Sequence, residues 1–168
     1  MRLLFLNPVG TIGGAERVLL DLVASLRAAA PSIDVHLAAA ADGPLLDAAR
    51  SLRVSATVLP LPPSAGELGD SGLAGGRSAL SLLLRGPAGA WAAWRYGRQL
   101  RRFVDQIRPD VVHSNGIKFH LLTHLARLRG TPVVWHLHDF LSGRRIAAPA
   151  LRWAARSAAG AVAVSRAV

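Results

Sequence analysis

Apolar residues near the amino terminus form a continuous run and then a spaced stripe, with a glycine-rich turn between them. Residues 3–6 are all apolar, which is the pattern of a strand buried on both faces of a sheet. Pro8 and three glycines interrupt this run: Gly10, Gly13 and Gly14. Apolar residues then recur at helical spacing: Val18, Leu19, Leu22, Val23 and Leu26. The stretch therefore predicts the opening βα unit of an α/β domain.

Strand and helix patterns continue to alternate along the rest of the chain. Further strands are predicted at 33–39, 54–59, 111–114, 132–137 and 161–164. Helices are predicted at 44–52, 78–107 with a break at Gly86-Pro87, 117–129 and 148–159, and a long loop at 60–76. Because the strands are apolar throughout, they favour a parallel sheet covered on both faces. We expect one Rossmann-like, doubly wound domain over residues 1–168 with strand order 3-2-1-4-5-6.

The polar residues of the chain gather where such a sheet binds ligands, beside the carboxyl ends of strands 1 and 4. Asn7 and the glycine turn follow strand 1, 113–116 end strand 4, and 136–139 end the neighbouring strand 5. Backbone N–H groups at the start of the first helix suit a phosphate or carboxylate. The alternative is a tight turn whose glycines merely permit positive φ.

Composition limits the partners and the compartment. The chain has no cysteine, which excludes disulfide and thiolate chemistry and fits a reducing compartment, so we expect a cytoplasmic protein. No apolar stretch reaches membrane-spanning length, and the amino terminus is not a signal peptide. The net charge of +10, nearly all from arginine, indicates a polyanion, an anionic membrane surface or a bias toward arginine. Aromatic residues make up 5% and no nucleic-acid motif is present, so we expect no nucleic-acid partner.

The sequence offers little support for three other kinds of site: a metal site, a serine–histidine catalytic pair and a dinucleotide site. His120 and His124 have the i, i+4 spacing of a helical metal pair, but no third ligand is evident, and we expect no metal. Ser114 and Ser142 have histidines nearby, yet neither lies in a nucleophile elbow. A dinucleotide site would need a different glycine pattern and an acidic residue at the end of strand 2, whereas Asp34 begins that strand.

Four segments occur in order at a familiar spacing: Gly13–Leu20 (GGAERVLL), Arg108–Asn115 (RPDVVHSN), Val133–Asp139 (VVWHLHD) and Ala161–Arg166 (AVAVSR). Together they resemble the N-terminal Rossmann-like half of a GT-B glycosyltransferase of the retaining family 4 type, over essentially the whole chain. The resemblance implies transfer of a sugar from a nucleotide-sugar, with retention, to a glycan or lipid-linked acceptor, and no cofactor. The alternative is a non-catalytic Rossmann-like domain that binds a dinucleotide or a polyanion.

The same resemblance implies that a C-terminal domain, missing from these residues, holds most of the donor. We therefore expect the chain alone to fold but to transfer no sugar, and to bind nucleotide-sugars more weakly than about millimolar.

The resemblance also assigns roles to single residues. Gly13 and Gly14 become contacts to the donor phosphates. His138 becomes the histidine near the reacting carbon, and Asp139 would orient it, although Asp139 could instead cap a helix or form a turn. The candidate acceptor contacts are His113, Asn115 and Lys118. Of these, Lys118 could meet an anionic head group.

The helix predicted from Trp91 to Arg108 has two contrasting faces. Its apolar face, expected to pack on the sheet, holds Tyr96, Leu100, Phe103, Val104 and Ile107. Its opposite face holds Trp91, Trp94, Arg95, Arg98, Arg101 and Arg102. Tryptophan beside arginine on a solvated face is typical of a helix lying on an anionic bilayer, so we expect peripheral association with the inner face of the membrane. The alternative is that the Gly66–Leu84 segment or a partner domain covers both rings.

Overall fold

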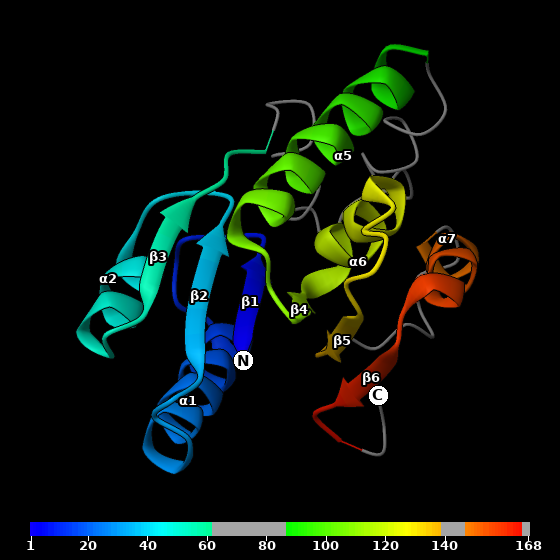
Figure 1. Ribbon diagram of the computed structural model, residues 1–168. Helices are drawn as coiled ribbons and strands as arrows, with labels where there is room; N and C mark the ends of the chain where they lie inside the picture. Colours follow the sequence, from blue (N-terminus) through cyan, green and yellow to red (C-terminus); the bar gives the residue numbers. More distant parts are fainter. Residues whose placement is uncertain (62–86, 139–146, 166–168) are drawn as a thin grey trace.

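A computed structural model describes residues 1–61, 87–138 and 147–165, which form a parallel sheet with helices on both faces (Figure 1). The sheet has six strands in the order β3-β2-β1-β4-β5-β6, and every neighbouring pair is parallel. This confirms the predicted Rossmann-like, doubly wound architecture. The strands are β1 (Arg2–Asn7), β2 (Asp34–Ala39), β3 (Ser55–Val58), β4 (Val111–Asn115), β5 (Val133–Leu137) and β6 (Gly160–Ala163).

The described helices follow the predicted pattern, with differences at their ends. They are α1 (Gly14–Ala29), α2 (Pro44–Ser51), α5 (Pro87–Ile107), α6 (Gly116–Ala126), α7 (Ala147–Ala154) and the 3₁₀ turn η1 (Ala155–Ser157). Helix α6 ends earlier than predicted because Arg127 adopts a left-handed conformation, with φ of 49°. Helix α7 gives way to the 3₁₀ turn, so it does not reach residue 159. The predicted helical piece at 78–86 and most of the predicted loop at 60–76 lie outside the described residues.

Two hydrophobic layers explain why β1 is apolar from Leu3 to Leu6. Leu3 and Phe5 of β1 pack against α1 and α2 on one face of the sheet. Leu4 and Leu6 pack on the other face, in the layer formed with α5, α6 and α7. Because successive side chains of a strand point to opposite faces, a strand such as β1 buries apolar residues on both faces over most of its length.

The predicted apolar face of α5 is confirmed. Tyr96, Leu100 and Val104 are buried in the layer between the helix and the sheet, and the Tyr96 hydroxyl donates a hydrogen bond to the Leu59 carbonyl oxygen (3.3 Å). Gly97 lies against α6, where an added Cβ would come within 3.3 Å of the Ala126 backbone nitrogen. Glycine at this position therefore lets α5 and α6 approach closely.

The course of α5 follows from the parallel sheet. β3 ends at the carboxyl edge and β4 begins at the amino edge, so the connecting helix must run back from one edge to the other (Figure 1). The first turns of α5 consequently lie toward the carboxyl edge. None of the helices in the described part of the chain is long and apolar enough to span a membrane.

Candidate functional site

The candidate site lies at the carboxyl edge of the sheet, between the ends of β1 and β4, where the strand order reverses. Each of these strands ends in an asparagine. The Asn115 Nδ2 donates a hydrogen bond to the Asn7 Oδ1 over 2.6 Å, and the two residues are only 1% and 0% exposed. The two strand ends are therefore held together by a buried side-chain contact.

The same contact extends to the glycine turn through Glu16, which is buried in the first turn of α1. The Asn7 Nδ2 donates to the Glu16 Oε1 (3.3 Å) and to the Val9 carbonyl oxygen (2.7 Å), and the Gly13 N–H donates to the Glu16 Oε2 (3.0 Å). We call Asn115, Asn7, Glu16 and the Gly13 N–H the asparagine–glutamate network. It ties the turn to both strands, so the turn has a fixed position above the sheet.

The glycines of the turn serve different purposes. Gly10 packs directly on the connection between β2 and α2, where an added Cβ would lie 2.3 Å from the Asp42 carbonyl oxygen. Gly13 has φ of −109°, which most residues can adopt. In the described part of the chain, the glycines with positive φ are Gly43, Gly116 and Gly130. The alternative in which the turn glycines merely permit positive φ is therefore wrong.

Gly13 and Gly14 form the exposed amino-terminal end of α1. Gly13 is the N-cap and has no side chain to offer, and the N–H groups of the first helical turn have no acceptor within the helix. Glu16 accepts from the Gly13 N–H, so the amides best placed for an anion are those of Gly14 and Ala15. An added Cβ at Gly14 would meet nothing within 4 Å. The helix end is thus open on this side.

Three histidines form a row across β4 and β5, on the face of the sheet that Phe5 shares with α1. The His113 ring lies 4.9 Å from the Phe5 ring and 5.2 Å from the His136 ring, and the His136 ring lies 4.0 Å from the His138 ring. We call His113, His136 and His138 the histidine row. Since His138 follows β5, the row ends at the carboxyl edge. Asp139, its predicted partner, lies outside the described residues.

Burial keeps two histidines of this row, His113 and His136, uncharged near neutral pH. Removal from water, and then the neighbouring His136 and His138, lower the pKa of His113 to about 4. Burial and then His138 lower the pKa of His136 to about 4. The Nδ1 atoms of His113 and His136 have no hydrogen-bond partner among the described residues. His113 and His136 therefore present neutral imidazoles that can each donate one hydrogen bond and accept another.

The three predicted acceptor contacts differ in accessibility. His113 and Lys118 are half-buried, on β4 and on the first turn of α6. Asn115 is buried and bonded to Asn7, so its side chain does not reach the surface. Asn115 therefore holds the strand ends together in this structure, and its contact with the acceptor stays a prediction.

A serine–histidine pair does exist in the fold, but it lies in the core. The Ser114 Oγ and His120 Nδ1 are 2.7 Å apart, the residues are 0% and 1% exposed, and the His120 ring stacks on Trp135. Burial lowers the pKa of His120 to about 3. His124 instead hydrogen-bonds the Ser157 Oγ (2.7 Å). The described residues contain no group of three His, Cys, Asp or Glu side chains able to hold a metal ion.

The role of Glu16 was not predicted from the sequence. An acidic residue three positions after a helix N-cap is the pattern of a capping box, in which its carboxylate accepts from the N-cap backbone N–H. That pattern was present after Gly13 and could have indicated the contact. The second bond, to Asn7, has no local signature.

Solved structures share this fold over nearly the whole chain, and three of them serve as examples. They are Anabaena HepE in complex with UDP (TM-score 0.65, 23% identity, 99% of this chain and 38% of that one), the lipopolysaccharide outer core galactosyltransferase WaaB (0.64, 16%, 99% and 40%) and a UDP-N-acetylglucosamine 2-epimerase (0.56, 15%, 97% and 42%). This chain therefore spans 38–42% of the length of these proteins. At such identities the likeness concerns the fold, since one fold hosts several activities.

No curated protein sequence matches the chain significantly. The family model described as Glycosyltransferase Family 4 matches residues 12–168, a range that includes the start of α1, the ends of β4 and β5, and α5. Together with the GT-B neighbours, this match confirms the resemblance inferred from the four sequence segments. The chain belongs to Glycosyltransferase Family 4.

Proposed function

We propose that this chain is the acceptor-side half of an enzyme that transfers a sugar, with retention, from a nucleotide-sugar to a glycan or lipid-linked acceptor. The observation that carries the proposal is that the open end of α1 and the end of the histidine row lie at the same edge of the sheet. Family membership supports glycosyl transfer, and the UDP bound to HepE supports a nucleotide-sugar donor.

The donor side of the reaction would use the start of α1. Transfer breaks the bond between the anomeric carbon and a phosphate oxygen, so negative charge develops on the departing nucleoside diphosphate. The N–H groups of Gly14 and Ala15, at the positive end of a 16-residue helix, would stabilise that charge without a metal. The Glu16 carboxylate opposes an anion on the buried side of the turn, so the phosphate would approach from the exposed Gly14 side.

The acceptor side would use the histidine row and α6. His138 would lie against the transferred sugar, where its contact with the His136 ring at 4.0 Å restricts its orientation. His113 and Lys118 would meet the acceptor, with Lys118 able to pair with an anionic head group. Asp139 would orient His138. A second domain would hold most of the nucleotide, so this chain alone would bind nucleotide-sugars weakly and transfer no sugar.

Two substitutions in a protein that also contains the second domain test the proposal. Gly14→Val adds a β-branched side chain in open space, so it should leave the fold intact while blocking the approach of the phosphate. We expect turnover, measured as release of nucleoside diphosphate, to fall by roughly 10²-fold or more, the usual cost of losing such stabilisation. His138→Ala should likewise lower turnover by roughly 10²-fold while donor binding is kept.

Gly160→Val provides the matched control, because an added Cβ at Gly160 also meets nothing within 4 Å and this residue begins β6 at the opposite edge of the sheet. The control should keep normal turnover. Near-normal rates in both Gly14→Val and His138→Ala would show that the carboxyl edge is structural and would reject the site.

A further inference from the structure

Three of the four tryptophans of the chain are exposed, and all three lie on the helices of one layer. Trp91 and Trp94 of α5 are 57% and 53% exposed, and Trp153 of α7 is 49% exposed. Both helices pack against α6, and Trp94 and Trp153 line the same hollow between them. Tryptophan is among the costliest side chains to leave in water, so such a group marks a surface that meets something else.

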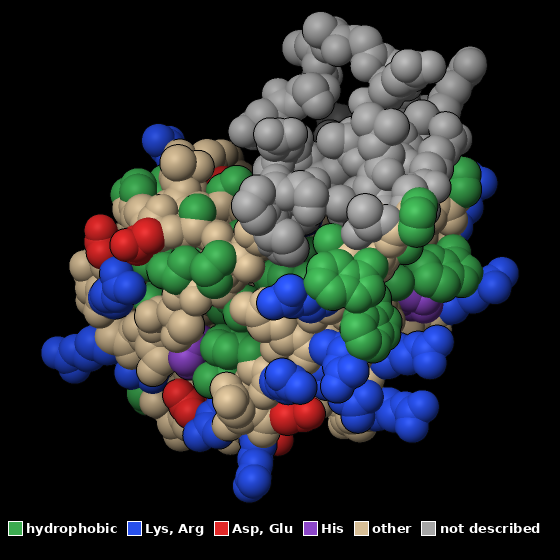
Figure 2. Space-filling model, turned by 90° about the horizontal axis from the view of Figure 1, so that it is seen from above, with side chains coloured by type: hydrophobic (Ala, Val, Ile, Leu, Met, Phe, Trp, Pro, Cys, Tyr) green, Lys and Arg blue, Asp and Glu red, His purple; other side chains and the backbone are tan. Residues whose placement is uncertain are grey.

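The sequence pattern had identified the α5 half of this group; α7 and α6 extend it. We define the basic tryptophan face by its eight residues: Trp91, Trp94, Trp153, Arg95, Arg98, Arg101, Arg102 and Arg127. Among the described residues around this face, one acidic side chain is present, that of Asp105, whose Oδ2 lies 3.9 Å from the Arg101 Nε. Figure 2 shows large hydrophobic side chains gathered beside a band of Lys and Arg side chains. The face therefore combines apolar area with a strong excess of positive charge.

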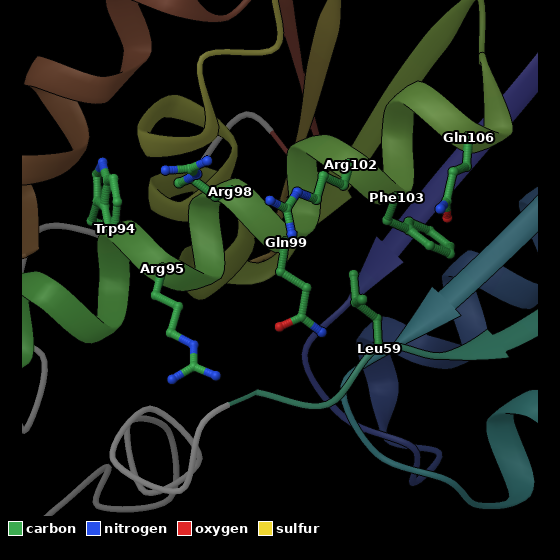
Figure 3. Close-up of a pocket in the computed structure, with 8 residues that line it drawn as sticks. All are labelled: Leu59, Trp94, Arg95, Arg98, Gln99, Arg102, Phe103 and Gln106. Atoms are coloured by element: carbon green, nitrogen blue, oxygen red, sulfur yellow. The ribbon is translucent and has the colours of Figure 1, made fainter.

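The exposed side of α5 forms a ridge with a hollow on each flank. One hollow, of about 630 Å³, lies between α5 and Leu59 at the end of β3. Figure 3 shows Arg95 and Gln99 pointing from the helix to one side, and Trp94 and Arg98 to the other. The second hollow, of about 620 Å³, lies between α5, the end of α6 and α7. Each hollow is large enough for a phosphate-bearing head group and is lined by guanidinium groups.

We propose that the basic tryptophan face docks the protein on an anionic lipid bilayer. Indole rings prefer the head-group level of a membrane, where one end of the ring is apolar and the other wet. Arginine pairs with phosphate through two parallel hydrogen bonds. The basic tryptophan face offers three tryptophans and five arginines on adjoining helices. Tryptophan and arginine together fit an anionic membrane surface better than either residue type alone.

A nucleic acid would also be attracted by this charge, but the rings are arranged against it. Single-stranded nucleic acids bind by stacking bases on open aromatic faces along a basic groove. Here the Arg95 guanidinium carbon already lies 5.4 Å from the Trp91 ring centre, and the Arg98 carbon lies 5.0 Å from the Trp94 ring centre. Each of these cation–π contacts occupies one face of its ring, which leaves less aromatic surface for bases to stack on and keeps positive charge beside the ring.

The position of the face gives docking a consequence. Since the first turns of α5 lie toward the carboxyl edge of the sheet, Trp91 and Trp94 lie toward the edge that holds the candidate site. A docked molecule would hold that edge close to the bilayer. The docking itself does not depend on the proposed glycosyl transfer, and its test needs no enzymatic activity.

The experiment measures co-sedimentation of the chain with vesicles of phosphatidylcholine alone and of phosphatidylcholine mixed with phosphatidylglycerol in equal parts, at low and high salt. We expect binding to the anionic vesicles that weakens at high salt, and little binding to the neutral ones. Because three of the four tryptophans lie on the face, binding should also shift the tryptophan emission to shorter wavelength. Both readouts use the unmodified chain.

Two sets of variants locate the surface. Trp91→Ala/Trp94→Ala and Arg98→Gln/Arg101→Gln each alter exposed side chains only, and each should weaken partition into anionic vesicles by roughly tenfold or more. The control Arg50→Gln/Arg53→Gln removes the same charge from exposed positions at the end of α2, so it should have a much smaller effect.

Several results would overturn the proposal. Equal binding to neutral and anionic vesicles, or binding to neither, would remove the membrane as the partner. If Arg50→Gln/Arg53→Gln weakened binding to anionic vesicles as much as Arg98→Gln/Arg101→Gln, the binding would depend on net charge alone and not on a defined face. Binding to a single-stranded oligonucleotide at physiological salt, with no binding to vesicles, would assign the face to nucleic acid instead.

Discussion

Replacement of Glu16 by glutamine should destabilise the fold although the two side chains have nearly the same shape. The Glu16 Oε1 accepts from the Asn7 Nδ2 and the Oε2 accepts from the Gly13 N–H, so both oxygens face donors. Glutamine has a single acceptor oxygen, and its NH₂ group would have to face one of these donors. Whichever way the amide turns, two donors point at each other.

The size of the effect follows from the burial of the site. Asn7 is fully buried, so the glutamine oxygen should turn toward it, which leaves the part-buried Gly13 N–H facing the glutamine NH₂ group. Leaving one buried donor unsatisfied costs about 1–3 kcal/mol, and the lost charge at the start of α1 adds about 0.3–1 kcal/mol. Because Gly13 lies at the exposed end of α1, we expect the lower part of this range, a fall in the free energy of unfolding of about 1–2 kcal/mol, which is a measurable share of the stability of a domain of this size.

Urea denaturation of the wild type and of Glu16→Gln measures this difference. Asp21→Asn is the matched control, because it removes a carboxylate from an exposed position of the same helix and should change stability by less than about 0.5 kcal/mol. Amide hydrogen exchange gives a local readout, since the Gly13 N–H should exchange faster when its acceptor is gone. If Glu16→Gln is no less stable than Asp21→Asn, the asparagine–glutamate network does not hold the glycine turn.

Two further predictions concern packing and pH. Gly97→Leu should lower the thermal midpoint, with a cost of about 1–3 kcal/mol, because even a Cβ there comes within 3.3 Å of the Ala126 nitrogen; an unchanged midpoint would mean that α5 does not pack so closely on α6. Burial lowers the pKa of His113 and His136 to about 4 and that of His120 to about 3, from 6.5, so the unfolded chain binds more protons between about pH 6.5 and 4. The free energy of unfolding should therefore fall as the pH drops through this window, and equal urea midpoints at neutral pH and about pH 5 would contradict the buried, neutral state of the histidines.

The layered architecture could be predicted because the relevant information is local. A continuous apolar run such as Leu3–Leu6 buries both its faces when it lies between two helical layers. The strand order then follows from the doubly wound class that the alternation of strands and helices indicates. The helix that begins at Pro87 could also be predicted from local information, since proline fits the first helical turn. Among the described elements the largest differences are at the carboxy-terminal ends of α6 and α7, where single backbone conformations decide.

The site could be predicted in position but not in the role of each residue. Gly10 and Gly14 look alike in the sequence, yet a Cβ at Gly10 would strike the Asp42 carbonyl oxygen, while a Cβ at Gly14 would meet nothing. Asn115 has its partner 108 residues away, so neither its burial nor its positioning role has a local signal. Trp153 was missed on the basic tryptophan face because its place beside Trp94 depends on how α7 packs on α6.

The asparagine–glutamate network also limits how relatives of this protein can be recombined. It joins the ends of β1 and β4 to the first turn of α1, so a crossover between residues 16 and 115 would take Asn7 and Glu16 from one parent and Asn115 from the other. If one parent lacks the asparagine that corresponds to Asn7 or Asn115, the recombined protein would have a buried donor or acceptor without a partner between the ends of β1 and β4. Crossovers after β4 leave the network within one parent, so libraries that exchange β5, α7 and β6 as a block should yield more folded proteins than libraries cut within α2 or α5.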